Sequence, residues 1–175
     1  MGYLVLAIDQ RSGQTFGGIT NETAARAKAK GLPDAYTDAL PDMIAAISYA
    51  RDTLGAQKLI IWGSSYSASL SLVIAGTQSN LIDGVLAFSP GEYFRGKPSV
   101  HAAAKTIKAP IFITAAKSES KQWHGIFNAL PDKTAKIGYK PSGTGKHGSS
   151  ALLSPNAPEY WTAVNTFLKA HFGVE

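Results

Sequence analysis

The fold is decided by the stretch Leu59-Ile60-Ile61-Trp62-Gly63-Ser64-Ser65-Tyr66-Ser67-Ala68. An apolar run ends in Gly-x-Ser-x-Ser and passes directly into a second apolar segment, which predicts a strand, a tight turn and a helix. Gly63 and Ser67 are small because strand and helix approach each other closely around such a turn. A serine at its tip exposes the hydroxyl above the end of the sheet. The stretch therefore predicts that Ser65 is a nucleophile.

Two neighbouring serines are weaker candidates for the same role. Ser64 would need a small residue in place of Trp62 two positions earlier. Ser67 lies one helical turn too far from the end of the strand. Ser65 remains the preferred nucleophile.

Short apolar runs alternate with helical patterns along the rest of the chain. Strands are predicted over residues 3–8, 59–62, 84–88, 111–115 and 135–139. Beyond the helix after Ser65, helices are predicted over residues 22–28, 41–54, 100–107, 122–130 and 158–171. The last of these is expected to bury Trp161, Val164, Phe167 and Leu168. This alternation predicts one domain over residues 1–175, a three-layer α/β/α fold with a mostly parallel sheet of about five strands.

The composition fits a globular protein and excludes several classes of site. Hydrophobic residues make up 45% of the chain and charged residues 17%, which argues against disorder. With no cysteine, the chain has no disulfide, thiolate metal site or cysteine nucleophile. The net charge is +5, but the lysines are scattered and lack interleaved aromatic residues, so no nucleic-acid partner is expected. No apolar run approaches the ~20 residues of a membrane span and no leader is visible, so we expect a cytoplasmic protein without membrane contact.

A serine nucleophile needs a base, which is nearly always an imidazole oriented by a carboxylate. In an open α/β sheet these groups lie on loops at the carboxyl ends of strands. Only His147 lies on such a loop, because His101, His124 and His171 fall within helical patterns. His147 is therefore the predicted base.

Two carboxylates follow strands and compete for the role of the acid. Glu119 comes four residues after the strand predicted over 111–115 and is preferred. Glu92, just after the strand predicted over 84–88, is the alternative. Glu119 could instead serve only as a helix-start carboxylate, stabilised by the helix dipole.

Four segments resemble the α/β-hydrolase superfamily. The segment 63–67 resembles its nucleophile elbow, with serine in place of the second glycine, and 116–119 resembles its acid turn, with glutamate for the commoner aspartate. Lys146-His147-Gly148 resembles its histidine loop, and residues 2–13 resemble the strand and glycine turn that precede the elbow. The chain is most similar to compact dienelactone-hydrolase-like esterases, because no large cap lies between residues 88 and 110.

The resemblance implies that the first three strands of the family are missing. The run Tyr3–Ile8 would correspond to the fourth of eight strands, so the sheet would lack a strand beside it. Unpaired backbone groups are costly, so we expect one of three arrangements. Tyr3–Ile8 moves beside the strand 59–62, or another copy of the chain covers the exposed sheet edge, or the sequence is an incomplete copy of a longer protein.

The residues and the resemblance together imply a serine hydrolase, most simply a carboxylesterase of small esters. Ser65, His147 and Glu119 would form the triad, and the Tyr66 N–H would bind the oxyanion, with no cofactor or metal. The family's second oxyanion donor has no counterpart here, although glycines of the loop 10–18 could replace it. A thioesterase or small peptidase with the same triad is the alternative, as is a non-catalytic scaffold.

Overall fold

A computed structural model describes residues 2–173, which divide into two compact units. Tyr3–Leu59 form one unit, and Gly2 with residues 60–173 form the other. The unit 60–173 holds the whole sheet and all of the predicted site residues. The single domain predicted over 1–175 stays a prediction.

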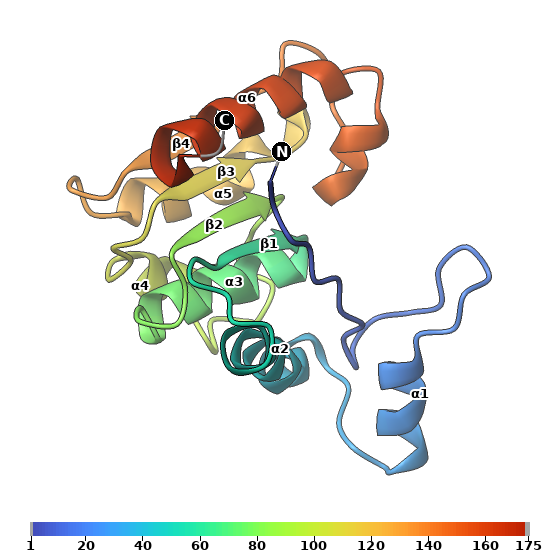
Figure 1. The fold of residues 1–175 in the computed structure, drawn as a ribbon. Helices are drawn as coiled ribbons and strands as arrows, with labels where there is room; N and C mark the ends of the chain where they lie inside the picture. The colour runs from blue at the N-terminus through green and yellow to red at the C-terminus, as the bar shows by residue number, and fades with distance from the viewer. Residues whose placement is uncertain (1, 174–175) are drawn as a thin grey trace. The chain divides into compact units, whose positions relative to one another are not determined.

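The sheet of the unit 60–173 is fully parallel. Its strands run in the order β1-β2-β3-β4 (Figure 1), and they are β1 (Ile60–Ser64), β2 (Gly84–Phe88), β3 (Ile111–Thr114) and β4 (Lys136–Tyr139). In the register of the sheet, Leu86 of β2 lies between Trp62 of β1 and Phe112 of β3. β2 and β3 are buried along their whole length, as parallel strands covered on both faces must be.

Helices cover both faces of this sheet (Figure 1). One face carries α3 (Tyr66–Thr77), α4 (Val100–Ala104) and α5 (Ser120–Ala129), and the other carries α6 (Ala157–Phe172). The aromatic rings of Phe88 and Phe112 meet α6, with centroids 6.4 Å from Tyr160 and 5.7 Å from Phe167. The predicted three-layer α/β/α class is confirmed, with four strands in place of about five.

The burial predicted for α6 is correct for three of its four residues. Val164, Phe167 and Leu168 are buried, but Trp161 is 39% exposed. Trp161 packs edge-on against Trp62, at a centroid distance of 5.8 Å. Trp62 lies in the edge strand β1 and is itself 40% exposed, because no further strand of the described residues covers the pair.

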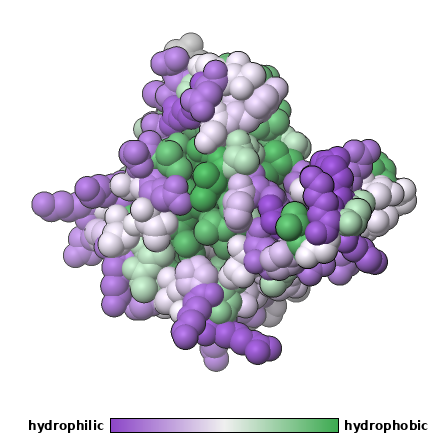
Figure 2. All heavy atoms as spheres, turned by 90° about the horizontal axis from the view of Figure 1, so that it is seen from below, coloured by the Kyte–Doolittle hydropathy of each residue, from purple (hydrophilic) through white to green (hydrophobic). Residues whose placement is uncertain are grey.

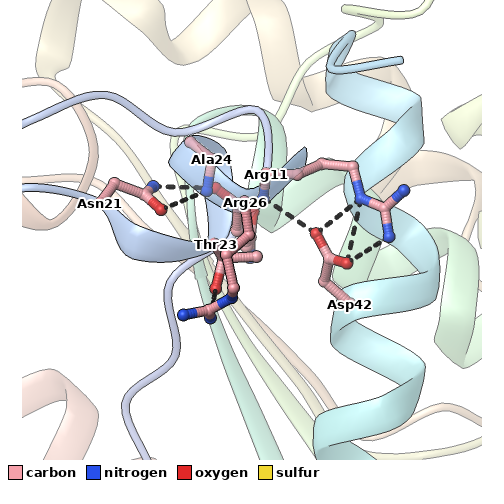
Figure 3. Close-up of polar contacts among 7 residues, drawn as sticks. Arg11, Asn21, Thr23, Ala24, Arg26 and Asp42 are labelled. Carbon is pink, nitrogen blue, oxygen red and sulfur yellow. Dashed lines mark hydrogen bonds and ion pairs between the residues drawn. The ribbon is translucent and has the colours of Figure 1, made fainter. Parts of the chain in front are cut away.

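The unit Tyr3–Leu59 is helical, with α1 (Glu22–Ala29), the 3₁₀ helix η1 (Tyr36–Ala39) and α2 (Leu40–Asp52). Figure 3 shows polar contacts within this unit. Arg11 donates to Asp42 of α2 from its backbone N–H at 2.9 Å and from its guanidinium at 2.6 Å. Asn21 caps α1, accepting the Ala24 N–H at 2.8 Å.

The strand predicted over Tyr3–Ile8 does not form. Within the described residues, the run pairs with no strand, and β1 pairs with β2 alone. Its apolar side chains are not covered either, because Leu4 is 79% and Val5 is 81% exposed. An apolar run becomes a strand only where a neighbour takes up its backbone hydrogen bonds. Of the three arrangements expected for this run, pairing with the strand 59–62 is therefore not seen within the described residues.

Large hydrophobic side chains reach the surface in each unit. Figure 2 shows green, hydrophobic atoms at the surface among purple, hydrophilic ones. Phe16 is 89% exposed in the unit Tyr3–Leu59, and Leu153 is 87% exposed in the unit 60–173. Among the described helices, none combines the length and the hydropathy required to span a bilayer.

Candidate active site

Ser65 lies in the turn between β1 and α3, at the tip predicted from the sequence. Its backbone has φ 59° and ψ −127°, a conformation that few residues other than glycine adopt. Its N–H donates to the Phe88 carbonyl at 2.8 Å, which fixes the turn to the end of β2. A Cβ at Gly63 would lie 2.5 Å from the Ala68 Cα, so the predicted need for a small residue there is confirmed.

Tyr66 is the first residue of α3. The N-terminus of an α-helix carries a partial positive charge, which stabilises an anion placed beside it. The role of the Tyr66 N–H as an oxyanion donor stays a prediction.

The structure brings the predicted base and acid together. Glu119 ends the 3₁₀ helix η2 (Lys117–Glu119) after β3, and His147 directly precedes the 3₁₀ helix η3 (Gly148–Leu153). His147 Nδ1 lies 2.5 Å from Glu119 Oε1. The Glu119 side chain is 17% exposed and the His147 side chain 50%, so the carboxylate is half-buried and the imidazole is open to solvent.

The second oxygen of the Glu119 carboxylate is also held. Oε2 accepts the Ser89 hydroxyl at 2.7 Å and the Ala116 N–H at 3.3 Å. Burial alone would raise the pKa of Glu119, but the hydrogen bonds from Ser89, His147 and the Ala116 N–H lower that pKa below its ordinary value. Glu119 is therefore ionised at neutral pH, as an acid that orients an imidazole must be.

The loop that carries His147 is attached to the serine turn. The Ser149 N–H donates to the Ser64 hydroxyl at 3.0 Å. Gly148 has φ 59°, and a Cβ built on it would lie 2.3 Å from Ser64 Oγ and 3.8 Å from the Ser65 nitrogen. The backbone of residues 148–149 is thus packed against the Ser64 side chain, next to Ser65.

No hydrogen bond joins the Ser65 hydroxyl to His147 within residues 2–173. The structure thus couples the predicted base to the predicted acid and brings the His147 loop to the turn of Ser65. Nucleophile–base hydrogen bonds in enzymes without substrate are often long or poorly aligned, and they tighten when substrate binds.

The residues that compete for these roles have other contacts. Glu92 accepts the N–H groups of Val100 and His101 at 3.1 and 2.6 Å, so it caps the start of α4 and is not paired with His147. The hydroxyl of Ser64 is taken by the histidine loop, as described above. His101, His124 and His171 lie in α4, α5 and α6, as their sequence patterns predicted.

Ser89 is the one residue of this arrangement that sequence reasoning missed. It comes directly after β2 and is 1% exposed. The available signal was a small polar residue at the carboxyl end of a central buried strand, where site residues of parallel sheets gather. In the described part of the chain, no group of three His, Cys, Asp or Glu side chains is placed to hold a metal ion.

No protein-family model matches the chain, and no curated protein matches its sequence. It is similar to the solved structure of an esterase from Pyrococcus furiosus, with a TM-score of 0.61 and 18% identity over 75% of this chain and 62% of that one. A dienelactone hydrolase from Anabaena variabilis gives a TM-score of 0.62 at 13% identity, covering 86% of this chain and 67% of that one. An acylaminoacyl peptidase from Pyrococcus horikoshii gives 0.63 at 19%, covering 90% of this chain and 31% of that one.

These similarities show that the chain has the α/β-hydrolase fold, which confirms the resemblance seen in its sequence. The chain spans less than two thirds of the Pyrococcus furiosus esterase.

Proposed function

We propose that the protein is a serine hydrolase, and most specifically a carboxylesterase that cleaves small esters. The observation that carries the proposal is the contact of His147 Nδ1 with Glu119 Oε1, at 2.5 Å. The loop that carries His147 is in turn hydrogen-bonded to Ser64, in the turn of Ser65. A half-buried, ionised carboxylate behind a solvent-open imidazole is an arrangement that can activate a serine hydroxyl.

The proposed reaction proceeds through an acyl-enzyme. Ser65 Oγ attacks the ester carbonyl carbon while its proton passes to His147, and Glu119 stabilises the imidazolium that forms. The tetrahedral oxyanion is bound by the Tyr66 N–H at the start of α3. The bond to the alcohol then breaks, and His147 returns the proton to the leaving oxygen. Water, deprotonated by His147, attacks the acyl group and releases the carboxylic acid and free Ser65.

Hydrolysis of p-nitrophenyl acetate by purified protein tests the proposal. We expect measurable turnover by the natural protein and a rate at buffer level for Ser65→Ala, because loss of the nucleophile removes about 10⁶ in kcat. Glu119→Gln should lose about 10⁴, because the imidazole is no longer held or charge-stabilised. Glu92→Gln is the matched control and should keep the rate. Equal rates for Ser65→Ala and the natural protein, both folded, would contradict the proposal.

A small peptidase or thioesterase with the same residues is the second candidate. The similarity to an acylaminoacyl peptidase, over 90% of this chain, supports the peptidase form. Parallel assays with an acyl-amino-acid p-nitroanilide and an acyl thioester separate the three, since the preferred leaving group gives the largest kcat/KM. A non-catalytic scaffold would show no Ser65-dependent rate with any of them.

A further inference from the structure

Ser89 is a buried residue with no part in the reaction steps given above. Its hydroxyl donates to Glu119 Oε2 at 2.7 Å and accepts the Gly148 N–H at 2.8 Å. These partners lie 30 and 59 residues further along the chain. One hydroxyl therefore joins the proposed acid to the residue that follows the proposed base.

The backbone of Ser89 is held in an uncommon conformation. Its φ is 56°, in the left-handed region, which residues other than glycine rarely adopt. Its N–H donates to the Thr114 carbonyl at 2.7 Å, and its carbonyl accepts the Tyr93 hydroxyl at 2.8 Å. Glycine would adopt this φ without strain, but it has no hydroxyl to offer.

The hydroxyl decides how the Glu119 carboxylate is oriented. With Ser89, Oε2 has a donor at 2.7 Å, and Oε1 is left to face His147. Without it, the carboxylate would retain only the longer bond from the Ala116 N–H on that oxygen, at 3.3 Å. The Gly148 N–H would at the same time lose its acceptor inside the protein, which is costly for a buried donor.

We propose that Ser89 is a positioning residue, whose hydroxyl locks Glu119 and the His147 loop into one geometry. The proposal rests on the serine hydrolase function and deepens it. Ser89 touches neither substrate nor reacting atoms, and it acts through Glu119 and Gly148.

Two substitutions and a matched control test this role. Ser89→Ala removes the hydroxyl and keeps the strained backbone, whereas Ser89→Gly removes the hydroxyl and relieves the strain. The control is Ser69→Ala, because the Ser69 hydroxyl is equally buried and also makes two hydrogen bonds, to the carbonyl and N–H of Gly91 at 2.7 and 2.9 Å. That hydroxyl contacts neither Glu119 nor the histidine loop.

We expect kcat to fall about 10-fold to 100-fold in both Ser89 variants, which is part of the 10²–10⁴ that acid–base catalysis contributes. KM should change little, because the hydroxyl serves the transition state and does not bind substrate. Ser69→Ala should retain kcat within a factor of about three. Ser89→Gly carries the test even if Ser89→Ala folds poorly. Equal kcat in the Ser89 and Ser69 variants would overturn the proposal.

A spectroscopic measurement tests the same role without any substrate. The proton between His147 and Glu119 should give a downfield resonance, assigned by its loss in His147→Gln. We expect that resonance to move or broaden in both Ser89 variants and to stay unchanged in Ser69→Ala. If it stays unchanged in the Ser89 variants, the positioning role is wrong. If it moves while Ser65→Ala hydrolyses as fast as the natural protein, the positioning role holds and only the proposed function fails.

Discussion

Three residues of the candidate site share a left-handed backbone. Ser65 has φ 59°, Ser89 φ 56° and Gly148 φ 59°. Two of them carry side chains, which makes this conformation cost about 1–3 kcal/mol at each. Ser65 directly follows β1, Ser89 directly follows β2, and the Gly148 N–H donates to the Ser89 hydroxyl, so the three residues lie together at the ends of these strands. Strain that the fold retains at several residues of one site is typical of functional positions.

We predict that Gly148→Ala displaces the histidine loop. Alanine at position 148 would have to adopt the uncommon backbone φ of 59°, and its Cβ would lie 2.3 Å from Ser64 Oγ. Stability should fall by about 1–3 kcal/mol, measured by urea unfolding, with esterase activity falling as well. The double variant Ser64→Ala/Gly148→Ala removes the atom that the new Cβ strikes, so the two losses should sum to more than the measured one. Strict additivity in this double-mutant cycle would show that the contact is not the cause.

The sequence allows some of these residues to be predicted and hides others. Ser65 is recognisable because its constraint is local, with small residues required two positions before and after it. His147 and Glu119 are recognisable because each follows a strand of a parallel sheet. Ser89 also follows a strand, but its role could not be predicted from that position, because the role depends on partners 30 and 59 residues away. The distance between two loops is a property of the folded sheet and not of any one segment.

Helix α6 fixes the loop that leads from β4 to His147. Glu159 Oε2 accepts the Tyr139 hydroxyl at 2.9 Å and the Ser142 N–H at 3.0 Å. Asn156 accepts the Gly145 N–H at 3.3 Å. The first turns of α6 therefore hold both ends of this loop.

We predict a pH-dependent contribution of Glu159 to stability. The Ser142 N–H is the largest cause that lowers the pKa of Glu159 to about 2, from an ordinary value of 4.5, and the Tyr139 hydroxyl adds to it. A carboxyl group whose pKa is lowered by folding stabilises the protein above its ordinary pKa, and that contribution is lost as the pH falls toward the lowered value. Thermal unfolding of the natural protein and of Glu159→Gln should therefore differ at pH 6 and converge as the pH falls from about 4.5 to 2.

Glu22→Gln is the control for this measurement. The Glu22 side chain is 76% exposed and pairs with Arg26 on the same helix. Its effect should be small throughout the same pH range, because exposed ion pairs contribute little. A difference for Glu159→Gln that stays constant down to pH 2 would contradict the role assigned to this carboxylate.

Helices and central strands follow local rules, and this explains why they were predicted well. Asn21 caps α1, and the apolar spacing of α2 buries Met43 and Ile47. The run Tyr3–Ile8 has an equally strand-like pattern, yet it forms no strand, because none of the described strands pairs with it. A strand depends on a partner that its own sequence does not specify.

The sheet ends at β1, which pairs only with β2 among the described strands. An open edge of this kind invites pairing with another chain.

We expect a second copy of this chain to associate through exposed apolar residues, because Leu4 and Val5 are 79% and 81% exposed. Light scattering should give a mass above that of a monomer for the natural protein and a lower mass for Leu4→Lys/Val5→Lys. Leu153→Lys, at a residue 87% exposed in the other unit, should leave the mass unchanged. A monomeric natural protein would contradict this expectation.

The α/β-hydrolase fold establishes the setting of the site, and the reactivity of Ser65 is the central claim built on it. Covalent labelling with a fluorophosphonate tests that claim most directly, because the reagent reacts with an activated serine whatever the natural substrate is. We predict one phosphonyl group per chain, located on Ser65 by peptide mass spectrometry, absent in Ser65→Ala and much slower in His147→Gln. Labelling that does not occur, or that persists unchanged in Ser65→Ala, would contradict the account.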